Sequence, residues 1–209
     1  MNVKIIETMI RGDAIMEEYN NESIKTQRVK TYFIQATKDI IISEGLENAT
    51  VRNIAQKAGY AVSTLYQYFE QLNQLLLEVK KSYVFDLMAE IQKHVVVESY
   101  DAEDIKAQNR AFMSFFIEQP NIYPFFYKDL DSSSMGNFDN LVFSKDYFKI
   151  YEAFSEQGII NKKDIPNIAK IIVYSMNGMM RIYFSNHGLT KEEIFEDLDN
   201  IIDFLLKKK

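Results

Sequence analysis

The feature that most constrains this 209-residue chain is the segment 50–69, in which a glycine separates two helical patterns. Four apolar residues before that glycine follow the spacing of a helix: Val51, Ile54, Ala55 and Ala58. Thr50 stands at the N-cap position of this helix, and Gly59 can take the left-handed conformation that ends it. Leu65 and Phe69 then lie four residues apart, as on one face of a second short helix. The segment therefore predicts a helix-turn-helix, whose second helix suits the major groove of DNA.

This segment resembles the DNA-binding head of the TetR family of bacterial and archaeal repressors. The family pattern is Thr, then Ile-Ala, then Ala-Gly-Val-Ser-Lys-Gly-Thr-Leu-Tyr-x-Tyr-Phe. The residues that match it at the right spacing are Thr50, Ile54, Ala55, Ala58, Gly59, Thr64, Leu65, Tyr66, Tyr68 and Phe69. The resemblance covers residues 25–207, strongly over 25–90 and only in layout beyond. It implies an all-α fold with a three-helix head at the N-terminus and a helical C-terminal domain for regulation and dimerisation.

The residues that we expect to contact DNA are Thr50, Arg52, Ser63, Thr64, Tyr66, Gln67 and Tyr68. The Gln67 amide can bind adenine through two hydrogen bonds, and Thr64 can contact a thymine methyl group or a phosphate. The resemblance implies that Tyr66 and Tyr68 contact phosphates, although one of them can instead pack against the first helix. Thr50 can hold a phosphate at the helix N-terminus or serve only as an N-cap, and the two roles can coexist.

The chain departs from the family pattern where lysines usually meet phosphates. Ala61 and Val62 stand at the start of the second helix, and Leu72 stands at the start of the next one. Ser63 replaces the usual glycine, which restricts close approach of the backbone. Each lost phosphate contact removes about one unit from the salt dependence of DNA binding. DNA binding is then either weaker than is usual in the family or supported by other cations of the head.

Charge is distributed in a way that permits a nucleic-acid partner. The whole chain has a net charge of −6, but residues 23–70 hold six basic and four acidic side chains. Lys25, Lys30 and Arg52 can therefore supply phosphate contacts in place of the missing lysines. An acidic body beneath a weakly basic head should suppress non-specific binding to DNA.

The sequence predicts three regions: an N-terminal arm over residues 1–22, a helix-turn-helix domain over 23–71, and a ligand-binding and dimerisation domain over 72–209. Helices of the body are expected over 72–97, 102–118, 139–157 and 165–187, with a short one within 121–131 and a loop over 132–137. We expect Asp164 to cap the helix 165–187, and Thr190 with Glu193 to form a capping box for the last helix. The helix 72–97 is expected to be the only covalent link between body and head.

Several functional classes are disfavoured by what the sequence lacks. There is no cysteine, so disulfides and thiolate metal sites are impossible, which fits a cytoplasmic protein. No run approaches the roughly 18 apolar residues of a membrane helix, so we expect no membrane partner. The two histidines, His94 and His187, lack the context of a metal site, and no cofactor or metal is expected. We find no catalytic or nucleotide-binding motif, so an enzyme is not expected.

Aromatic and methionine residues at helical spacing fill the body of the chain. Each of them alone is more often part of a core than of a pocket, but the resemblance implies a small-molecule cavity among these helices. The candidates for lining it are Phe112, Phe116, Phe126, Phe143, Tyr147, Tyr151, Met176 and Met180. Such a lining favours a flat or flexible apolar molecule, neutral or cationic, over a phosphorylated metabolite.

The last two helices carry more apolar residues than one core-facing stripe needs. Left exposed, these residues would form a larger apolar patch than a monomer tolerates, which predicts a homodimer. The candidates for its interface are Ile172, Met179, Tyr183, Ile194, Leu198, Ile201 and Leu205. We therefore expect a dimeric transcriptional regulator that binds a palindromic operator, most simply a repressor released by a small apolar ligand. The alternative is a ligand-binding module of the same fold whose head binds DNA only weakly.

Overall fold

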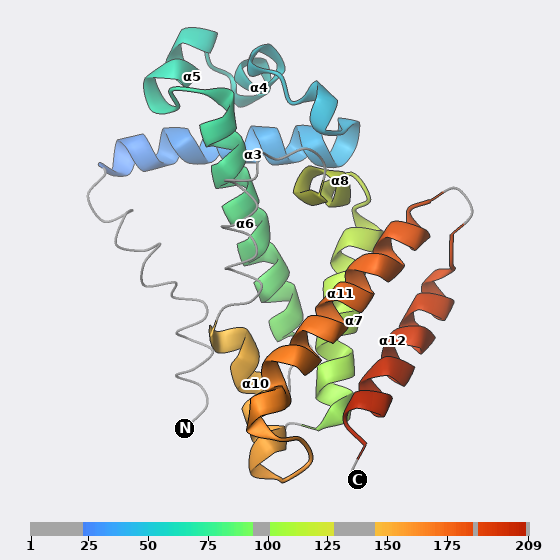
Figure 1. The fold of residues 1–209 in the computed structure, drawn as a ribbon. Helices are drawn as coiled ribbons and strands as arrows, with labels where there is room; N and C mark the ends of the chain where they lie inside the picture. Colours follow the sequence, from blue (N-terminus) through green and yellow to red (C-terminus); the bar gives the residue numbers. More distant parts are fainter. Residues whose placement is uncertain (1–22, 94–100, 128–144, 186–187, 208–209) are drawn as a thin grey trace. The chain divides into compact units, whose positions relative to one another are not determined.

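The computed structural model describes residues 23–93, 101–127, 145–185 and 188–207, with side chains from residue 151 onward in the third of these stretches. Every regular element in these stretches is a helix, which confirms the all-α class (Figure 1). The predicted N-terminal arm, residues 1–22, and the predicted loop, 132–137, lie outside the described residues. By packing, the described residues form two compact units.

The first unit begins with three helices that form the head: α3 (Ile24–Glu44), α4 (Val51–Ala58) and α5 (Val62–Tyr68). A short 3₁₀ turn, η1 (Leu46–Asn48), joins α3 to α4. The three helices enclose a small apolar core in which Phe33, Ile54, Leu65 and Phe69 are all at most 1% exposed. The rings of Phe33 and Phe69 meet edge to face at 6.4 Å, which ties α3 to the end of α5. The predicted helix-turn-helix is therefore present.

The ends of α4 follow the capping signals in the sequence. The Thr50 hydroxyl accepts a hydrogen bond from the Asn53 backbone N–H at 3.3 Å, as expected of an N-cap. Gly59 has φ 77°, in the left-handed region, and the next backbone N–H, of Tyr60, donates to the Ala55 carbonyl at 2.9 Å. This bond closes the last turn of α4 and directs the chain into α5.

Two further helices complete the first unit: α6 (Leu72–Gln92), of which residues up to Met88 belong here, and α8 (Ile122–Tyr127). The Asn121 amide donates to the Ile42 carbonyl at 3.0 Å, and this bond fixes α8 against the end of α3. The Lys80 ammonium of α6 donates to the Phe126 carbonyl at 3.2 Å. The chain thus returns to the head at α8, so α8 contacts the head through non-covalent bonds in addition to the covalent link through α6.

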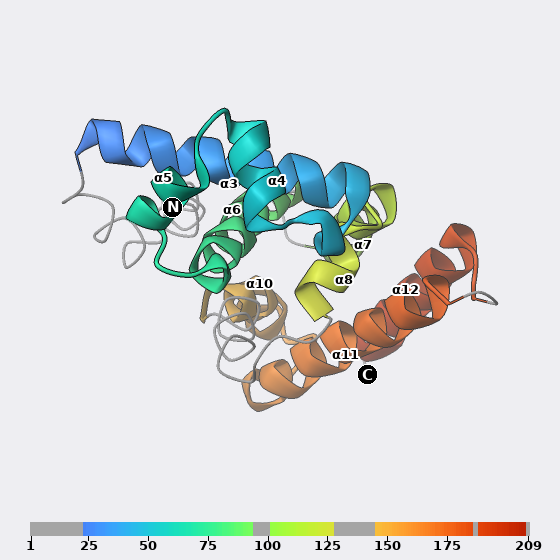
Figure 2. The ribbon, with the colours of Figure 1, turned by 90° about the horizontal axis from the view of Figure 1, so that it is seen from above.

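The second unit contains α7 (Ala102–Glu118), α10 (Lys145–Glu156), the turn η2 (Lys162–Asp164), α11 (Ile165–Tyr183) and α12 (Lys191–Leu205). The helices α11 and α12 run side by side in both views (Figures 1 and 2). The guanidinium of Arg110 on α7 pairs with Asp199 on α12 through two hydrogen bonds. One turn away, the Lys106 ammonium lies 2.7 Å from Asp203. These two ion pairs join α7 to α12.

The boundaries of the body helices agree with the sequence in part. The capping box is confirmed: the Thr190 hydroxyl accepts from the Glu193 N–H, and the Glu193 carboxylate accepts from the Thr190 N–H. These hydrogen bonds lower the pKa of the Glu193 carboxyl. Asp164 precedes α11 as expected but makes no capping bond, because its carboxylate accepts from the Asn161 amide at 3.1 Å instead.

Two long helices end earlier than the apolar pattern suggested. The helix α6 ends at Gln92, and the last predicted residues, 94–97, lie outside the described stretches. The helix α11 ends at Tyr183, four residues before His187, because the Phe184 N–H turns back to the carbonyls of Met180 and Ile182. Apolar residues continue past both ends, and their spacing alone does not show where the backbone stops being helical.

Candidate nucleic-acid interface

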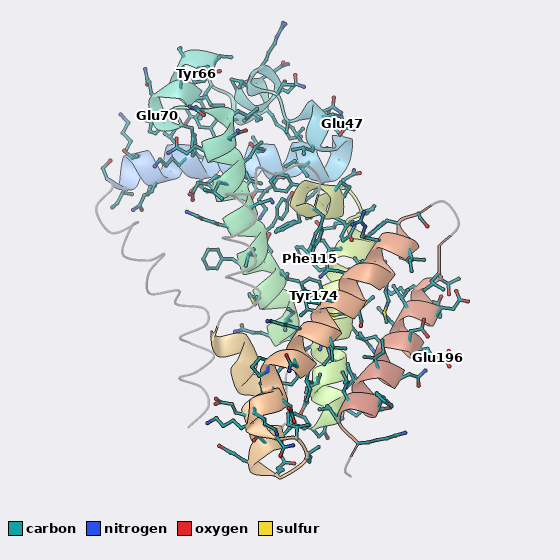
Figure 3. All side chains as sticks on the ribbon, viewed as in Figure 1. Glu47, Tyr66, Glu70, Phe115, Tyr174 and Glu196 are labelled. Carbon is teal, nitrogen blue, oxygen red and sulfur yellow. The ribbon has the colours of Figure 1, made fainter. Side chains whose placement is uncertain are left out.

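The second helix of the motif, α5, has one buried face and one exposed face. Leu65 is fully buried, whereas Ser63, Tyr66 and Gln67 are exposed, and Tyr66 reaches 50% exposure. Figure 3 shows Tyr66 on the outer side of α5, away from α3. A glutamine amide and a tyrosine hydroxyl on one accessible helix face can donate to and accept from base edges or phosphates. The geometry is therefore compatible with docking of α5 in a groove of DNA.

The two other recognition-helix candidates lie closer to the core. Thr64 and Tyr68 are half-buried. The family resemblance implies that both tyrosines of α5, Tyr66 and Tyr68, contact phosphates, with packing against the first helix as the alternative for one of them. Of the two, Tyr68 is the one whose burial favours packing, and Tyr66 is the one free to reach a ligand. The DNA-contact roles of all these residues stay predictions.

The start of α4 offers a second group of exposed polar atoms. The Thr50 hydroxyl oxygen accepts the bond from the Asn53 N–H, so its own hydrogen remains available to donate to a phosphate. Arg52 is exposed and forms no ion pair with any residue that the structure describes. A free guanidinium next to a helix N-terminus is suited to phosphate oxygens. Thr50 can thus cap the helix and contact DNA at the same time.

The start of α5 is apolar and exposed, as the departures from the family pattern predicted. Ala61 occupies the N-cap without a side-chain bond, and Val62 is 39% exposed. Leu72, at the start of α6, is half-buried. Neither Val62 nor Leu72 can form the ion contact that a lysine would make at its position. Any cations that hold the DNA backbone here must come from elsewhere on the head.

Sequence reasoning overlooked an aromatic group beside the turn of the motif. Tyr60 directly follows Gly59, and its ring lies 5.2 Å from the Phe33 ring and 6.3 Å from the Tyr32 ring. Tyr32 is 56% exposed, so this group reaches the surface. The signal for it was present in the sequence, because Tyr60 stands where the family pattern has valine.

Five of the six candidate ligand-lining residues whose side chains are described are buried, but they do not all belong to one unit. Phe116, Tyr151, Met176 and Met180 are at most 2% exposed in the second unit, and Phe112 is half-buried there. Phe126 belongs to the first unit, where its ring packs near Tyr83. Phe143 and the side chain of Tyr147 lie outside what the structure describes. Burial of this kind suits a core and a pocket lining equally, so the ligand site stays a prediction.

The candidate dimer residues include several that cannot serve as surface. Ile172, Ile194 and Leu198 are 0% exposed, and Met179 is 8% exposed, because they form the seam in which α11 packs against its own neighbours. Tyr183, Ile201 and Leu205 are half-buried. The large apolar residues that these two helices do expose are Ile171, Tyr174, Ile182 and Phe204. The periodic pattern thus identified the intramolecular face of α11 and α12.

The described residues hold no cluster of acidic residues and histidines that could bind a metal ion, and none of their helices is long and apolar enough to cross a membrane. No curated protein matches the sequence significantly. Residues 33–79 match the family model described as bacterial regulatory proteins of the TetR family.

Solved structures with the same fold cover nearly the whole chain. A proposed TetR-family transcriptional regulator from Mesorhizobium loti is 18% identical, with a TM-score of 0.65 over 88% of this chain and 98% of that one. Another, from Syntrophomonas wolfei, is 16% identical, with a TM-score of 0.68 over 87% and 96%. The TetR-family regulator PfmR from Thermus thermophilus is 22% identical, with a TM-score of 0.54 over 84% and 96%. The head segment 33–79 is therefore similar to the TetR family of bacterial regulatory proteins, and the chain has the fold of solved structures of TetR-family transcriptional regulators.

Proposed function

We propose that the protein is a sequence-specific DNA-binding repressor that a small ligand releases from its operator. The observation that carries this proposal is the exposed polar face of α5, with Gln67 and Tyr66, next to the free hydroxyl and guanidinium of Thr50 and Arg52 at the start of α4. Gln67 would read an adenine, and the other three would hold phosphates. A regulator of this kind acts where the chromosome is, in the cytoplasm, and needs no catalytic group.

The proposed active form is a homodimer built on α11 and α12. The exposed apolar residues Ile171, Tyr174 and Ile182 recur along one side of α11, and Phe204 of α12 is 75% exposed. Large apolar side chains in this number on two neighbouring helices favour burial against a second copy. Two heads related by a two-fold axis would then place their α5 helices about 34 Å apart, or somewhat more, on a palindromic site.

The proposed effector is an apolar molecule, neutral or cationic, bound in the second unit. Tyr151, Met176 and Met180 supply buried aromatic and flexible side chains of the kind that line such sites. The cations of α7 nearest the core, Lys106 and Arg110, are both paired with carboxylates of α12. Paired cations are poor partners for a phosphorylated ligand, since binding it would break an existing ion pair.

Selection from random duplexes, followed by gel shift at several salt concentrations, tests DNA recognition. The wild-type protein should enrich a palindromic sequence. Gln67→Ala should relax the preference at one base in each half-site at a cost of about 1–3 kcal/mol, whereas Tyr66→Phe should weaken all sequences alike. A wild-type protein that enriches no sequence and binds every duplex equally weakly would contradict the proposal.

The second candidate function is a ligand-binding module whose head binds DNA poorly. The exposed Val62 favours it, because the start of α5 offers an apolar side chain where a cation would meet the DNA backbone. The same selection separates the two functions. If the protein is a ligand-binding module, an effector should stabilise it but no DNA sequence should be enriched. If it is a repressor, an effector should stabilise it and a DNA sequence should be enriched.

A further inference from the structure

The N-terminal half of α3 has an exposed face outside the helix-turn-helix. Lys25, Arg28 and Tyr32 are spaced by three and then four residues, which places them on one side of the helix. All three are exposed, whereas Val29 and Phe33 on the adjacent, core-facing side are buried. The face therefore presents two cations and a tyrosine to solvent.

This face connects directly to the start of the recognition helix α5. The Tyr32 ring lies 6.3 Å from the Tyr60 ring, and Tyr60 immediately precedes Ala61, the N-cap of α5. Tyr60 is held in turn by the Phe33 ring at 5.2 Å and by its backbone bond to Ala55. Figure 2 shows α5 beside this half of α3. The three side chains thus continue the exposed surface of the motif.

The two cations on this face are available to bind an anion. Neither Lys25 nor Arg28 forms an ion pair within the described residues, and the first turn of α3 holds no acidic residue. The next acidic residue of the described helix, Asp39, accepts a hydrogen bond from Gln35 at 2.8 Å. A pair of unneutralised cations beside a tyrosine hydroxyl matches the charge and the acceptors of a phosphate backbone.

We propose that Lys25, Arg28 and Tyr32 form a second DNA contact, which binds the sugar–phosphate backbone beside the groove that holds α5. From residue 25 to residue 32 the helix rises about 10 Å, far enough to reach more than one phosphate of a strand. The contact supplies cations in place of the two lysines of the family pattern, whose positions are occupied here by Val62 and Leu72. It rests on the proposed function, because it assumes that α5 docks on DNA.

The test compares the salt dependence of operator binding in the full-length protein and its variants. The double variant Lys25→Ala/Arg28→Ala should bind all duplexes more weakly, with the slope of log K against log salt reduced by about two and base preference unchanged. Tyr32→Phe keeps the ring against Tyr60 and loses the hydroxyl, so binding should weaken roughly two- to tenfold at an unchanged melting temperature.

The matched control is Lys162→Ala/Lys163→Ala, which removes the same charge from two exposed positions of η2 in the other unit. It should keep the wild-type slope. If the wild-type protein and Gln67→Ala behave as proposed but the α3 double variant keeps the wild-type slope, the second contact is refuted and the repressor function stands. If the wild-type protein selects no sequence, the repressor function fails and this contact fails with it.

Discussion

Lys38 and Tyr83 contact each other twice, once through each side chain. The Lys38 ammonium lies 4.9 Å from the centre of the Tyr83 ring, and the Tyr83 hydroxyl donates to the Lys38 backbone carbonyl at 3.0 Å. The same ammonium lies 2.5 Å from the Asp86 carboxylate. Lys38 is 8% exposed and Tyr83 is 1% exposed. The pair therefore fixes the middle of α3 against α6, away from the helix ends that fray.

Tyr83→Phe should lower the free energy of unfolding by about 0.5–1.5 kcal/mol. The ring stays, so the contact with the Lys38 ammonium is kept and only the hydrogen bond is lost. Burial, followed by the charge of Asp86, raises the pKa of the Tyr83 hydroxyl, which keeps it a neutral donor. Urea unfolding measures the change, and Tyr66→Phe at an exposed position is the control. Equal stability of the two variants would contradict the role of this bond.

The head could be predicted well because its signals are local. Thr50 as N-cap and Gly59 as left-handed cap lie at the ends of one short helix, and each acts through its own backbone and nearest neighbours. The core position of Leu65 follows from helical periodicity in the same way. A family pattern at fixed spacing added further constraints. These signals do not depend on how distant segments pack.

The packing of α8 on the head and the exposed surface of α11 could not be predicted, because they depend on contacts between segments that are distant in the sequence. The attachment of α8 to the head rests on Asn121 with Ile42, which are 79 residues apart. The dimer interface stays a prediction: apolar periodicity marks the side of α11 that contains Ile172, and this side packs within the chain. Exposed apolar residues such as Tyr174 lie outside the periodic stripe that faces the core. Sequence periodicity finds buried residues and does not reveal which exposed apolar residues gather on a surface.

Val62→Lys should restore a phosphate contact at the start of α5. Val62 is 39% exposed, so a lysine there needs no rearrangement of the core. The slope of log K against log salt should become steeper by about one, with tighter binding to every duplex. The cost is a cation near a helix N-terminus, about 0.3–1 kcal/mol of stability at low salt. An unchanged slope would show that this position does not face the DNA backbone.

Tyr174→Glu should dissociate the proposed homodimer. Tyr174 is 62% exposed on α11 (Figure 3), so the substitution should leave the fold of one chain intact and bury a charge only in a dimer. Sedimentation at micromolar concentration should show two chains for the wild type and one for the variant. Phe85→Glu, at a 42% exposed aromatic position of α6, is the matched control and should remain dimeric. A monomeric wild type would refute the interface.

Thermal-shift measurements should show stabilisation by apolar compounds, neutral or cationic, and none by sugar phosphates. Binding to the native state alone raises stability by about 2.7 kcal/mol at a ligand concentration one hundred times Kd. Met176→Ala, at a position 2% exposed, should reduce the ligand-induced shift beyond its effect on the unliganded protein. Stabilisation by the sugar phosphates alone would contradict an apolar effector.

Lys80 should make stability depend on pH. Lys80 is 5% exposed; its ammonium donates to the Phe126 carbonyl and lies 5.5 Å from the Phe125 ring centre, without a carboxylate partner among the described residues. Burial lowers the pKa of Lys80 to about 8, from an ordinary value of 10.5. Between these two values the native state has lost the proton and the unfolded state still holds it. The free energy of unfolding should therefore rise as the pH passes through about 8.

Lys80→Met keeps a flexible apolar stem and removes the titrating group. Compared with the wild type, the variant should gain more stability at pH 7, where the wild-type protein must bury a charge, than at pH 9.5, where the amine is mostly neutral. Urea unfolding at the two pH values measures this, and tyrosine ionisation, near pH 10 in the unfolded chain, cancels in the comparison because both proteins hold the same tyrosines. Lys81→Met, which removes a half-buried lysine paired with Glu78 on the same helix, should shift stability equally at both values. If Lys80→Met differs from the wild type by the same amount at pH 7 and 9.5, Lys80 remains charged in the folded protein across this range.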